Sequence, residues 1–257
     1  MPPFVHLIAD YGVGDPAFSE VVHRLVAAEP SIRVESTAVP PFSTVATGFW
    51  IEQLGVHNPP FDDLLVYSNT APRTDEATPE GSALGGELCY LELDNGVPVV
   101  AVNAGYNLAF VKPGIETFRA IDTPAVGSQF RSRDFFPTRV AELATGDRHS
   151  LGEGLPVDTI PDPPESTVCH VDGYGNVKTS IRASAVDLAE REVPVALNGV
   201  ERTVVVAREA FEADEGTVML VPGSAGGEDP YLELISRGGS AAAAFDEPGP
   251  GDGLRIG

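Results

Sequence analysis

The sequence is poor in lysine, in cysteine and in long apolar runs. Only two of its 16 basic residues are lysines, Lys112 and Lys178. Two cysteines, Cys89 and Cys169, are too few for a disulfide framework or a zinc knuckle, so we interpret them as buried small residues. Asp, Glu, Arg or Pro interrupts every apolar segment before it is long enough to cross a bilayer. The first residues lack the pattern of a signal peptide, so we expect a soluble, cytoplasmic protein.

The charge balance is strongly acidic. Asp and Glu together number 38, which gives a formal net charge of -22. Nucleic-acid phosphates would repel such a chain, so DNA and RNA are not expected partners. An apolar fraction of 42% argues against disorder. Because concentrated salt screens repulsion between surface carboxylates, this balance and the shortage of lysine predict a haloarchaeal cytoplasmic protein. A merely acidic mesophilic protein is the alternative.

The first part of the chain alternates strand and helix patterns. Strands are expected at 4–9, 32–38 and 64–68, and helices at 16–28, 44–54 and 137–144. Strands 87–93 and 97–102 flank Asn95-Gly96, a pair that typically supplies the positive φ angles of a hairpin turn. This order predicts an α/β N-terminal domain, residues 1–153, with a mainly parallel sheet.

The second part of the chain has short strand patterns without helices. Residues 154–165 are rich in proline and read as a linker. Strands are then expected at 166–171, 176–181, 193–197, 202–206, 218–221, 231–235 and 254–256. We therefore expect residues 166–257 to form a smaller, all-β, barrel-like C-terminal domain.

Two segments have the residue types of a small-molecule site. Asp10 follows the first strand, at the sheet edge where α/β proteins bind ligands, and could hold ribose hydroxyls or cap a helix equally well. The nearby Gly12-Val-Gly14 lacks the third glycine of a dinucleotide fingerprint. Asp172-Gly-Tyr-Gly-Asn176 combines a carboxylate, an aromatic ring and an amide, which suits a nucleoside but also an ordinary β-turn. The histidines show no metal-ligand spacing, so no metal is predicted.

Four segments occur in order along the chain: Ile8-Ala-Asp-Tyr-Gly-Val-Gly-Asp15, Phe130-Arg-Ser-Arg-Asp-Phe-Phe-Pro137, Asp172-Gly-Tyr-Gly-Asn176 with Thr179-Ser-Ile181, and Gly223-Ser224 with Tyr231-Leu-Glu-Leu234. Together they resemble the S-adenosylmethionine hydroxide adenosyltransferases and the related fluorinases and chlorinases. The resemblance covers nearly the whole chain. It implies an α/β domain, a β-barrel domain and a homotrimer with active sites between neighbouring subunits.

The resemblance also implies roles for individual residues. Asp10 would hold the ribose hydroxyls and Phe42 would line the adenosyl pocket. Asp172 and Ser224 would hold the methionine end of S-adenosylmethionine. The other residues that we predict to bind substrate are Asn103, Phe130, Tyr174 and Asn176, the last two on the adenine side. No cofactor is implied beyond S-adenosylmethionine itself, which is the substrate.

The sequence departs from the family at the set that activates water. Ala71 stands where the family has Asp, and Arg131 stands where it has His. Thr74 and Ser132 fall where halide-using relatives place hydroxyl donors, although both could be ordinary surface residues, and Arg131 adds positive charge. We therefore predict Thr74, Arg131 and Ser132 as the catalytic residues.

Three functions are compatible with these residues. The first choice is hydrolysis of S-adenosylmethionine to adenosine and L-methionine. The second is transfer of the adenosyl group to a halide such as chloride. The third is a catalytically inactive protein that binds S-adenosylmethionine or adenosine.

Overall fold

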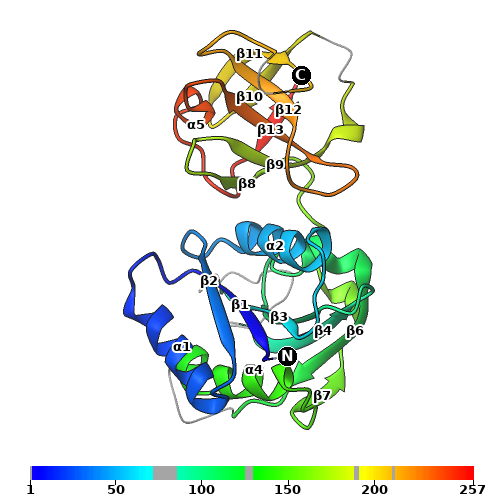
Figure 1. Cartoon of the computed structure of the whole chain (residues 1–257). Helices are drawn as coiled ribbons and strands as arrows, with labels where there is room; N and C mark the ends of the chain where they lie inside the picture. The colour runs from blue at the N-terminus through cyan, green and yellow to red at the C-terminus, as the bar shows by residue number, and fades with distance from the viewer. Residues whose placement is uncertain (1, 72–85, 125–129, 188–190, 210–211) are drawn as a thin grey trace. The chain divides into compact units, whose positions relative to one another are not determined.

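The computed structural model describes residues 2–71, 86–124, 130–187, 191–209 and 212–257. The chain divides into two compact units, Met1–Asp162 and Pro163–Gly257 (Figure 1). Each unit is built around its own seven-stranded sheet. The expected fold class is confirmed: the first unit is α/β with a set of parallel strands, and the second is a nearly closed β-barrel.

The sheet of the first unit has the strand order β2-β1-β3-β5-β4-β6-β7. Its strands are β1 (Phe4–Ala9), β2 (Arg33–Ala38), β3 (Leu64–Asn69), β4 (Glu87–Leu93), β5 (Pro98–Asn103), β6 (Ile115–Ile121) and β7 (Leu151–Gly154). Strands β2, β1, β3 and β5 are parallel neighbours, whereas β4, β6 and β7 pair antiparallel. The carboxyl ends of β1, β2, β3 and β5 therefore lie along one edge.

Helices cover both faces of this sheet. On one face, α1 (Pro16–Ala28), α3 (Arg131–Asp134) and α4 (Phe136–Ala144) lie together. The other face carries α2 (Thr44–Glu52), a following π turn (Gln53–His57) and a 3-10 turn (Ala109–Gly114). Asp15 caps α1 by accepting a 2.7 Å hydrogen bond from Ala17 N, and Pro16 suits the first helical turn. The two apolar cores thus lie above and below the sheet.

The structure differs from the sequence expectation in three elements of this unit. Strands β6 and β7 were not predicted, and neither was the short helix α3. In the β4–β5 hairpin only Gly96 has a positive φ angle, 81°, so the expectation that Asn95 shares it was wrong. The turn is instead closed by a 2.8 Å bond from Gly96 N to Leu93 O, and Val97 N donates to the Asn95 side chain.

The second unit has the strand order β14-β10-β11-β12-β13-β9-β8. Its strands are β8 (Val168–Val171), β9 (Val177–Arg182), β10 (Glu192–Leu197), β11 (Val200–Val206), β12 (Val218–Pro222), β13 (Tyr231–Ser236) and β14 (Leu254–Ile256). A bridge between Thr167 and Gly253 brings the two edges of the sheet together. The helix α5 (Ala241–Ala244) contributes to the barrel core. Short 3-10 turns occupy Val157–Thr159 in the first unit and Ala183–Ala185 in the second.

Strand β7 extends to Gly154, and Ile160 is buried in the core of the first unit, so much of the proline-rich segment packs there. Both cysteines are buried and free, as interpreted from the sequence. Within the described residues, no helix has the length and apolar character needed to cross a membrane.

Candidate functional site

The carboxyl edge of the parallel strands brings several polar side chains into one region. Asp10 directly follows β1, Asn69 ends β3 and Asn103 ends β5. Because β3 lies between β1 and β5, the backbones of Asp10 and Asn103 are separated by two strand spacings, roughly 10 Å. A nucleoside has about this length. One ligand can therefore contact both Asp10 and Asn103, but the two residues would bind different ends of it.

Asp10 and Phe42 are joined directly. The backbone N–H of Phe42 donates a 3.0 Å hydrogen bond to Oδ2 of Asp10. Phe42 has a φ angle of 62°, which is uncommon for an aromatic residue, and its side chain is 49% exposed. The bond therefore holds an unusual loop conformation in which the Phe42 side chain stays half exposed, as an aromatic wall of a ligand site requires.

Hydrogen bonds between buried polar groups stabilise the backbone at this edge of the sheet. Thr47 of α2 donates to the hydroxyl of Thr70, 2.9 Å away, and the side-chain amide of Asn107 donates to Thr70 O and to Val102 O at 2.8 Å. On the other face, the Asn69 amide donates to the Tyr11 hydroxyl at 2.8 Å. These contacts lock the ends of β3 and β5 to the helix α2.

Arg131 lies at a different place along the same edge. Its guanidinium donates to the Thr123 hydroxyl at 3.2 Å and lies 5.4 Å from the centroid of the Phe136 ring. The Nε atom of Arg131 is buried and has no hydrogen-bond partner among the described residues. A buried, unpaired charged donor is costly, so this atom is suited to an acceptor or an anion. Arg131 lines a pocket of about 790 Å³ with Thr123, Glu87 and Arg139.

Of the other residues predicted around Arg131, the structure describes Phe130 and Ser132. Phe130 is 55% exposed, and the guanidinium of Arg133 lies 5.0 Å from its ring centroid. The hydroxyl of Ser132, in α3, hydrogen-bonds to no residue in the described part of the chain. Thr74 lies outside the described residues.

The sheet order places β3, β5 and β4 between β1 and β6, so within one chain Asp10 is roughly 19 Å from the end of β6 near Thr123.

In the barrel, Asp172 organises its own loop. Its Oδ1 accepts hydrogen bonds from Tyr174 N at 2.9 Å and Asn176 N at 3.0 Å, and its Oδ2 accepts one from the Asn176 amide at 3.0 Å. Burial pushes the pKa of Asp172 upward, but these donors and the charge of Lys178 outweigh it and hold the pKa below its usual range. The carboxylate therefore stays ionised while it organises the turn.

The loop borders a pocket on the barrel of about 560 Å³. Tyr174, Asn176 and Ser224 all line it, so the structure brings these three predicted substrate-binding residues together. Tyr174 is 83% exposed and presents its ring, while Asn176 presents an amide held in place by Asp172. An aromatic face and a fixed amide are the groups that recognise a flat heterocycle.

Sequence reasoning did not identify the buried ion pair beside this pocket. Lys178 Nζ lies 2.7 Å from Oε1 of Glu233, and their side chains are 14% and 7% exposed. The same Glu233 oxygen accepts from Ser224 N at 2.9 Å, and Lys178 donates to the Ser224 hydroxyl at 3.2 Å. The signal in the sequence was a glutamate inside the otherwise apolar strand Tyr231–Ser236, where a buried charge requires a partner.

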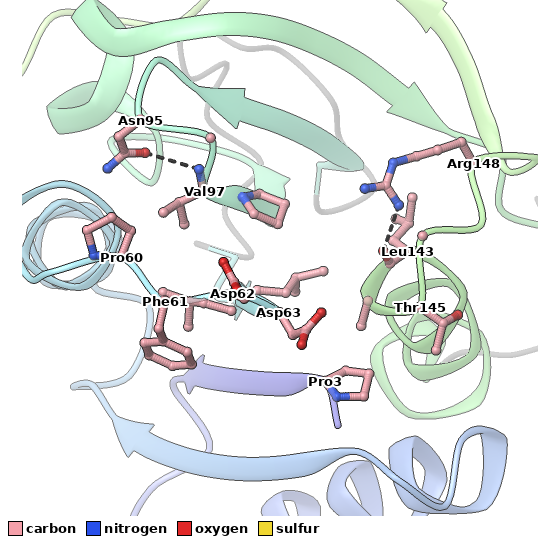
Figure 2. Close-up of a pocket in the computed structure, with 16 residues that line it drawn as sticks. Pro3, Pro60, Phe61, Asp62, Asp63, Asn95, Val97, Leu143, Thr145 and Arg148 are labelled. Atoms are coloured by element: carbon pink, nitrogen blue, oxygen red, sulfur yellow. Dashed lines mark hydrogen bonds between the residues drawn. The ribbon is translucent and has the colours of Figure 1, made fainter. Parts of the chain in front are cut away.

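A further pocket of about 790 Å³ lies at the opposite, amino-terminal edge of the parallel strands (Figure 2). Phe61, Asp62 and Asp63 line one side, and Arg148, which donates to Leu143 O, lines another. It contains none of the predicted site residues. Since ligands of open α/β sheets bind at the carboxyl ends of the strands, the Asp10 edge is the better candidate. Among the described residues, no cluster of His, Cys, Asp and Glu is suited to a metal ion.

Comparison with known proteins gives a family match for the barrel. Residues 166–251 match the family model described as the SAM hydroxide adenosyltransferase C-terminal domain. The match covers the barrel alone, which is therefore similar to the C-terminal domain of the S-adenosylmethionine hydroxide adenosyltransferases. The matched segment contains the loop 172–176, Ser224 and the Lys178–Glu233 pair.

Two solved structures share the fold over the full length. An uncharacterized conserved protein from Thermotoga maritima has a TM-score of 0.78 and 20% identity, covering 98% of this chain and 100% of its own. A conserved hypothetical protein from Thermus thermophilus has a TM-score of 0.70 and 23% identity, with 100% of both chains covered. At this identity they support the fold alone. No curated protein matches the chain.

Proposed function

We propose that the protein is an S-adenosylmethionine-dependent adenosyltransferase in which water replaces L-methionine at C5′ of the adenosyl group. The products are adenosine and L-methionine. The observation that carries the proposal is the pocket on the barrel, where Tyr174, Asn176 and Ser224 meet inside the domain matched by the family model. The Asp10–Phe42 pair supports it as a ribose and ring site on the first unit.

The roles divide by the chemistry of the substrate. Asp10 accepts hydrogen bonds from the vicinal ribose hydroxyls, and Phe42 packs on the adenosyl group. Tyr174 and Asn176 recognise the adenine, while Asp172 and Ser224 hold the amino-acid end. Phe130 and Asn103 complete the walls. All these groups bind and align; the reaction itself needs one oxygen in line with the C5′–S bond.

The reaction is a substitution. A water oxygen forms a bond to C5′ as the C5′–S bond breaks, and the electron pair of that bond remains on sulfur, giving neutral methionine sulfur. The water then loses a proton to solvent. Because the sulfonium is already a good leaving group, alignment and removal of solvent supply most of the acceleration, and a base contributes less. The presence of Ala71 and Arg131 in place of the family's Asp and His therefore slows the reaction without removing its basis.

A second candidate is transfer to a halide, and one observation favours it. The buried, unpaired Nε of Arg131 is a donor suited to an anion, and a halide needs donors that offset its lost hydration but no base. Ser132 and Thr74 would add hydroxyl donors. Chloride is the relevant halide in a salt-rich setting.

We propose a homotrimer with active sites at subunit boundaries, in the cytoplasm of a salt-adapted cell. The net charge of -22 and the low lysine content support the setting. Both lysines that the chain has are held in ion pairs, Lys112 with Asp162 and Lys178 with Glu233, each at 2.7 Å. We propose no cofactor beyond the substrate S-adenosylmethionine.

The test is product analysis in two salts. The protein is incubated with S-adenosylmethionine in molar potassium chloride and, separately, in potassium glutamate, and the products are resolved by chromatography. Adenosine in both salts supports hydrolysis, and a product that requires chloride supports transfer. Tight binding without turnover would leave a binding protein and contradict both reactions.

A further inference from the structure

The ammonium of Lys178 has a defined position beside Ser224. It donates to Oε1 of Glu233 at 2.7 Å and to the Ser224 hydroxyl at 3.2 Å. The side chain is 14% exposed. An ammonium has three N–H donors, and among the described residues only these two acceptors are provided. One N–H donor of Lys178 therefore remains for a ligand, and Ser224, which Lys178 contacts, lines the pocket on the barrel.

Ser224 alone is poorly prepared to bind an anion. Its backbone N–H already donates to Glu233 at 2.9 Å, and its hydroxyl lies 3.3 Å from the same carboxylate oxygen. A second carboxylate near Ser224 would be repelled by Glu233 unless a positive charge lay between them. Lys178 supplies a positive charge here, because its ammonium contacts both Ser224 and Glu233.

The charges near this site match those of an α-amino acid. Asp172 carries a negative charge at the loop that ends just before β9, and Lys178 in β9 is close enough to influence its pKa. A zwitterion needs an acceptor for its ammonium and a donor for its carboxylate. Asp172 supplies the first and Lys178 the second, whereas Ser224 has no charge to offer.

We propose that Lys178 binds the carboxylate of the amino-acid end of the substrate and determines specificity for it. This inference rests on the proposed function, since it concerns the same ligand. Glu233 is the positioning residue: it fixes the ammonium and the Ser224 backbone. Gly223 permits this, because a Cβ at that position would collide with the Glu233 side chain. The arrangement distinguishes S-adenosylmethionine from analogues that keep the nucleoside and the sulfonium but lack the carboxylate.

The experiment compares two ligands on four forms of the full-length chain. Affinity for S-adenosylmethionine and for decarboxylated S-adenosylmethionine is measured by calorimetry on the wild type, Lys178→Met, Lys178→Arg and the double variant Lys178→Met/Glu233→Gln. The double variant removes the unpaired buried carboxylate that the single variant would leave, so it keeps the test valid if Lys178→Met folds poorly. Lys112→Met is the matched control, since Lys112 is the other lysine and is also ion-paired.

We expect Lys178→Met and the double variant to bind S-adenosylmethionine about 10- to 100-fold more weakly, the range of a charge-assisted hydrogen bond. Their affinity for the decarboxylated ligand should change by less than about 3-fold. Lys178→Arg should retain most of the discrimination, and Lys112→Met all of it. Equal losses for both ligands, or no loss for either, would overturn the role of Lys178 while leaving the proposed function standing. A wild type that binds neither ligand would overturn the proposed function and this inference with it.

Discussion

The backbone N–H of Phe42 donates a 3.0 Å hydrogen bond to the carboxylate of Asp10, across 32 positions of sequence. This contact ties the end of β1 to the loop before α2 and holds Phe42 at a positive φ angle. It places the Asp10 carboxylate against the backbone of a half-exposed aromatic residue at the carboxyl edge of the sheet.

Asp10→Ala should abolish binding of both S-adenosylmethionine and adenosine, with a loss of at least about 100-fold measured by calorimetry. The variant removes the ribose acceptor and also frees the Phe42 loop. Asp15→Ala is the control: Asp15 caps α1, so its loss should lower stability by about 1 kcal/mol and leave affinity unchanged. Unchanged affinity in Asp10→Ala would remove Asp10 from the site.

Asp172 should make stability depend on pH. Its pKa is lower in the folded chain than in the unfolded chain, so its contribution is present above the ordinary carboxyl pKa of about 3.9 and disappears as the pH falls through the folded value. Urea unfolding of the wild type and Asp172→Asn should therefore differ at about pH 7 and converge at about pH 2. A difference that persists unchanged in acid would mean that the carboxylate charge does not stabilise the loop.

Arg131 should control any dependence on chloride. Arg131→Gln keeps a polar side chain but removes the charge and the unpaired Nε donor, so a chloride-dependent product should fall by at least about 10-fold. Arg139→Gln is the control, because Arg139 lines the same pocket but is paired with Glu142 at 2.8 Å. If the two variants behave alike, the pocket around Arg131 is not an anion site.

Concentrated salt should stabilise the fold. With a net charge of -22, repulsion between surface carboxylates is strong at low ionic strength and screened at high ionic strength. The melting temperature, followed by circular dichroism, should rise by at least about 5 °C between about 0.1 M and about 2 M potassium chloride. A flat or falling melting temperature would contradict the proposal of a salt-rich cytoplasm.

Gly48 should be irreplaceable in the middle of α2. A Cβ at this position would collide with the carbonyl oxygen of Tyr106 and with the Phe110 ring, so Gly48→Ala should destabilise the protein by about 1–3 kcal/mol in urea unfolding. Gly154→Ala is the matched control, since nothing lies within 4 Å of a Cβ built there. Its effect should stay within about 0.5 kcal/mol. Equal stability of the two variants would show that α2 can move away from the turn that covers it.

Much of the fold was predictable because its signals are local. The β1–α1–β2–α2–β3 order follows from alternating apolar patterns, from the cap at Asp15 and from Pro16. Strand β6 was not predicted because Glu116 and Arg119 interrupt its apolar residues. Strand β7 was not predicted because it has only four residues, of which two are glycines. Both strands depend on pairing with neighbours distant in sequence.

The candidate site was predictable only in part. The loop from Asp172 to Asn176 was identified because its residues are adjacent in sequence. The Lys178–Glu233 pair spans 55 positions and exists only through the register of β9 against β13. The contact of Arg131 with Thr123 depends in the same way on where α3 begins relative to the end of β6. Residue types along the chain indicate such partners only after the strands are paired.

The most direct test of the account is one reaction in water enriched in heavy oxygen. The protein is incubated with S-adenosylmethionine in molar potassium chloride, and the adenosine and methionine formed are examined by mass spectrometry. The account predicts adenosine that carries one heavy oxygen at C5′, together with unlabelled L-methionine, and no such product from Asp10→Ala. The absence of any labelled adenosine and of any chloride-dependent product would contradict the account, because substitution at C5′ would then not occur.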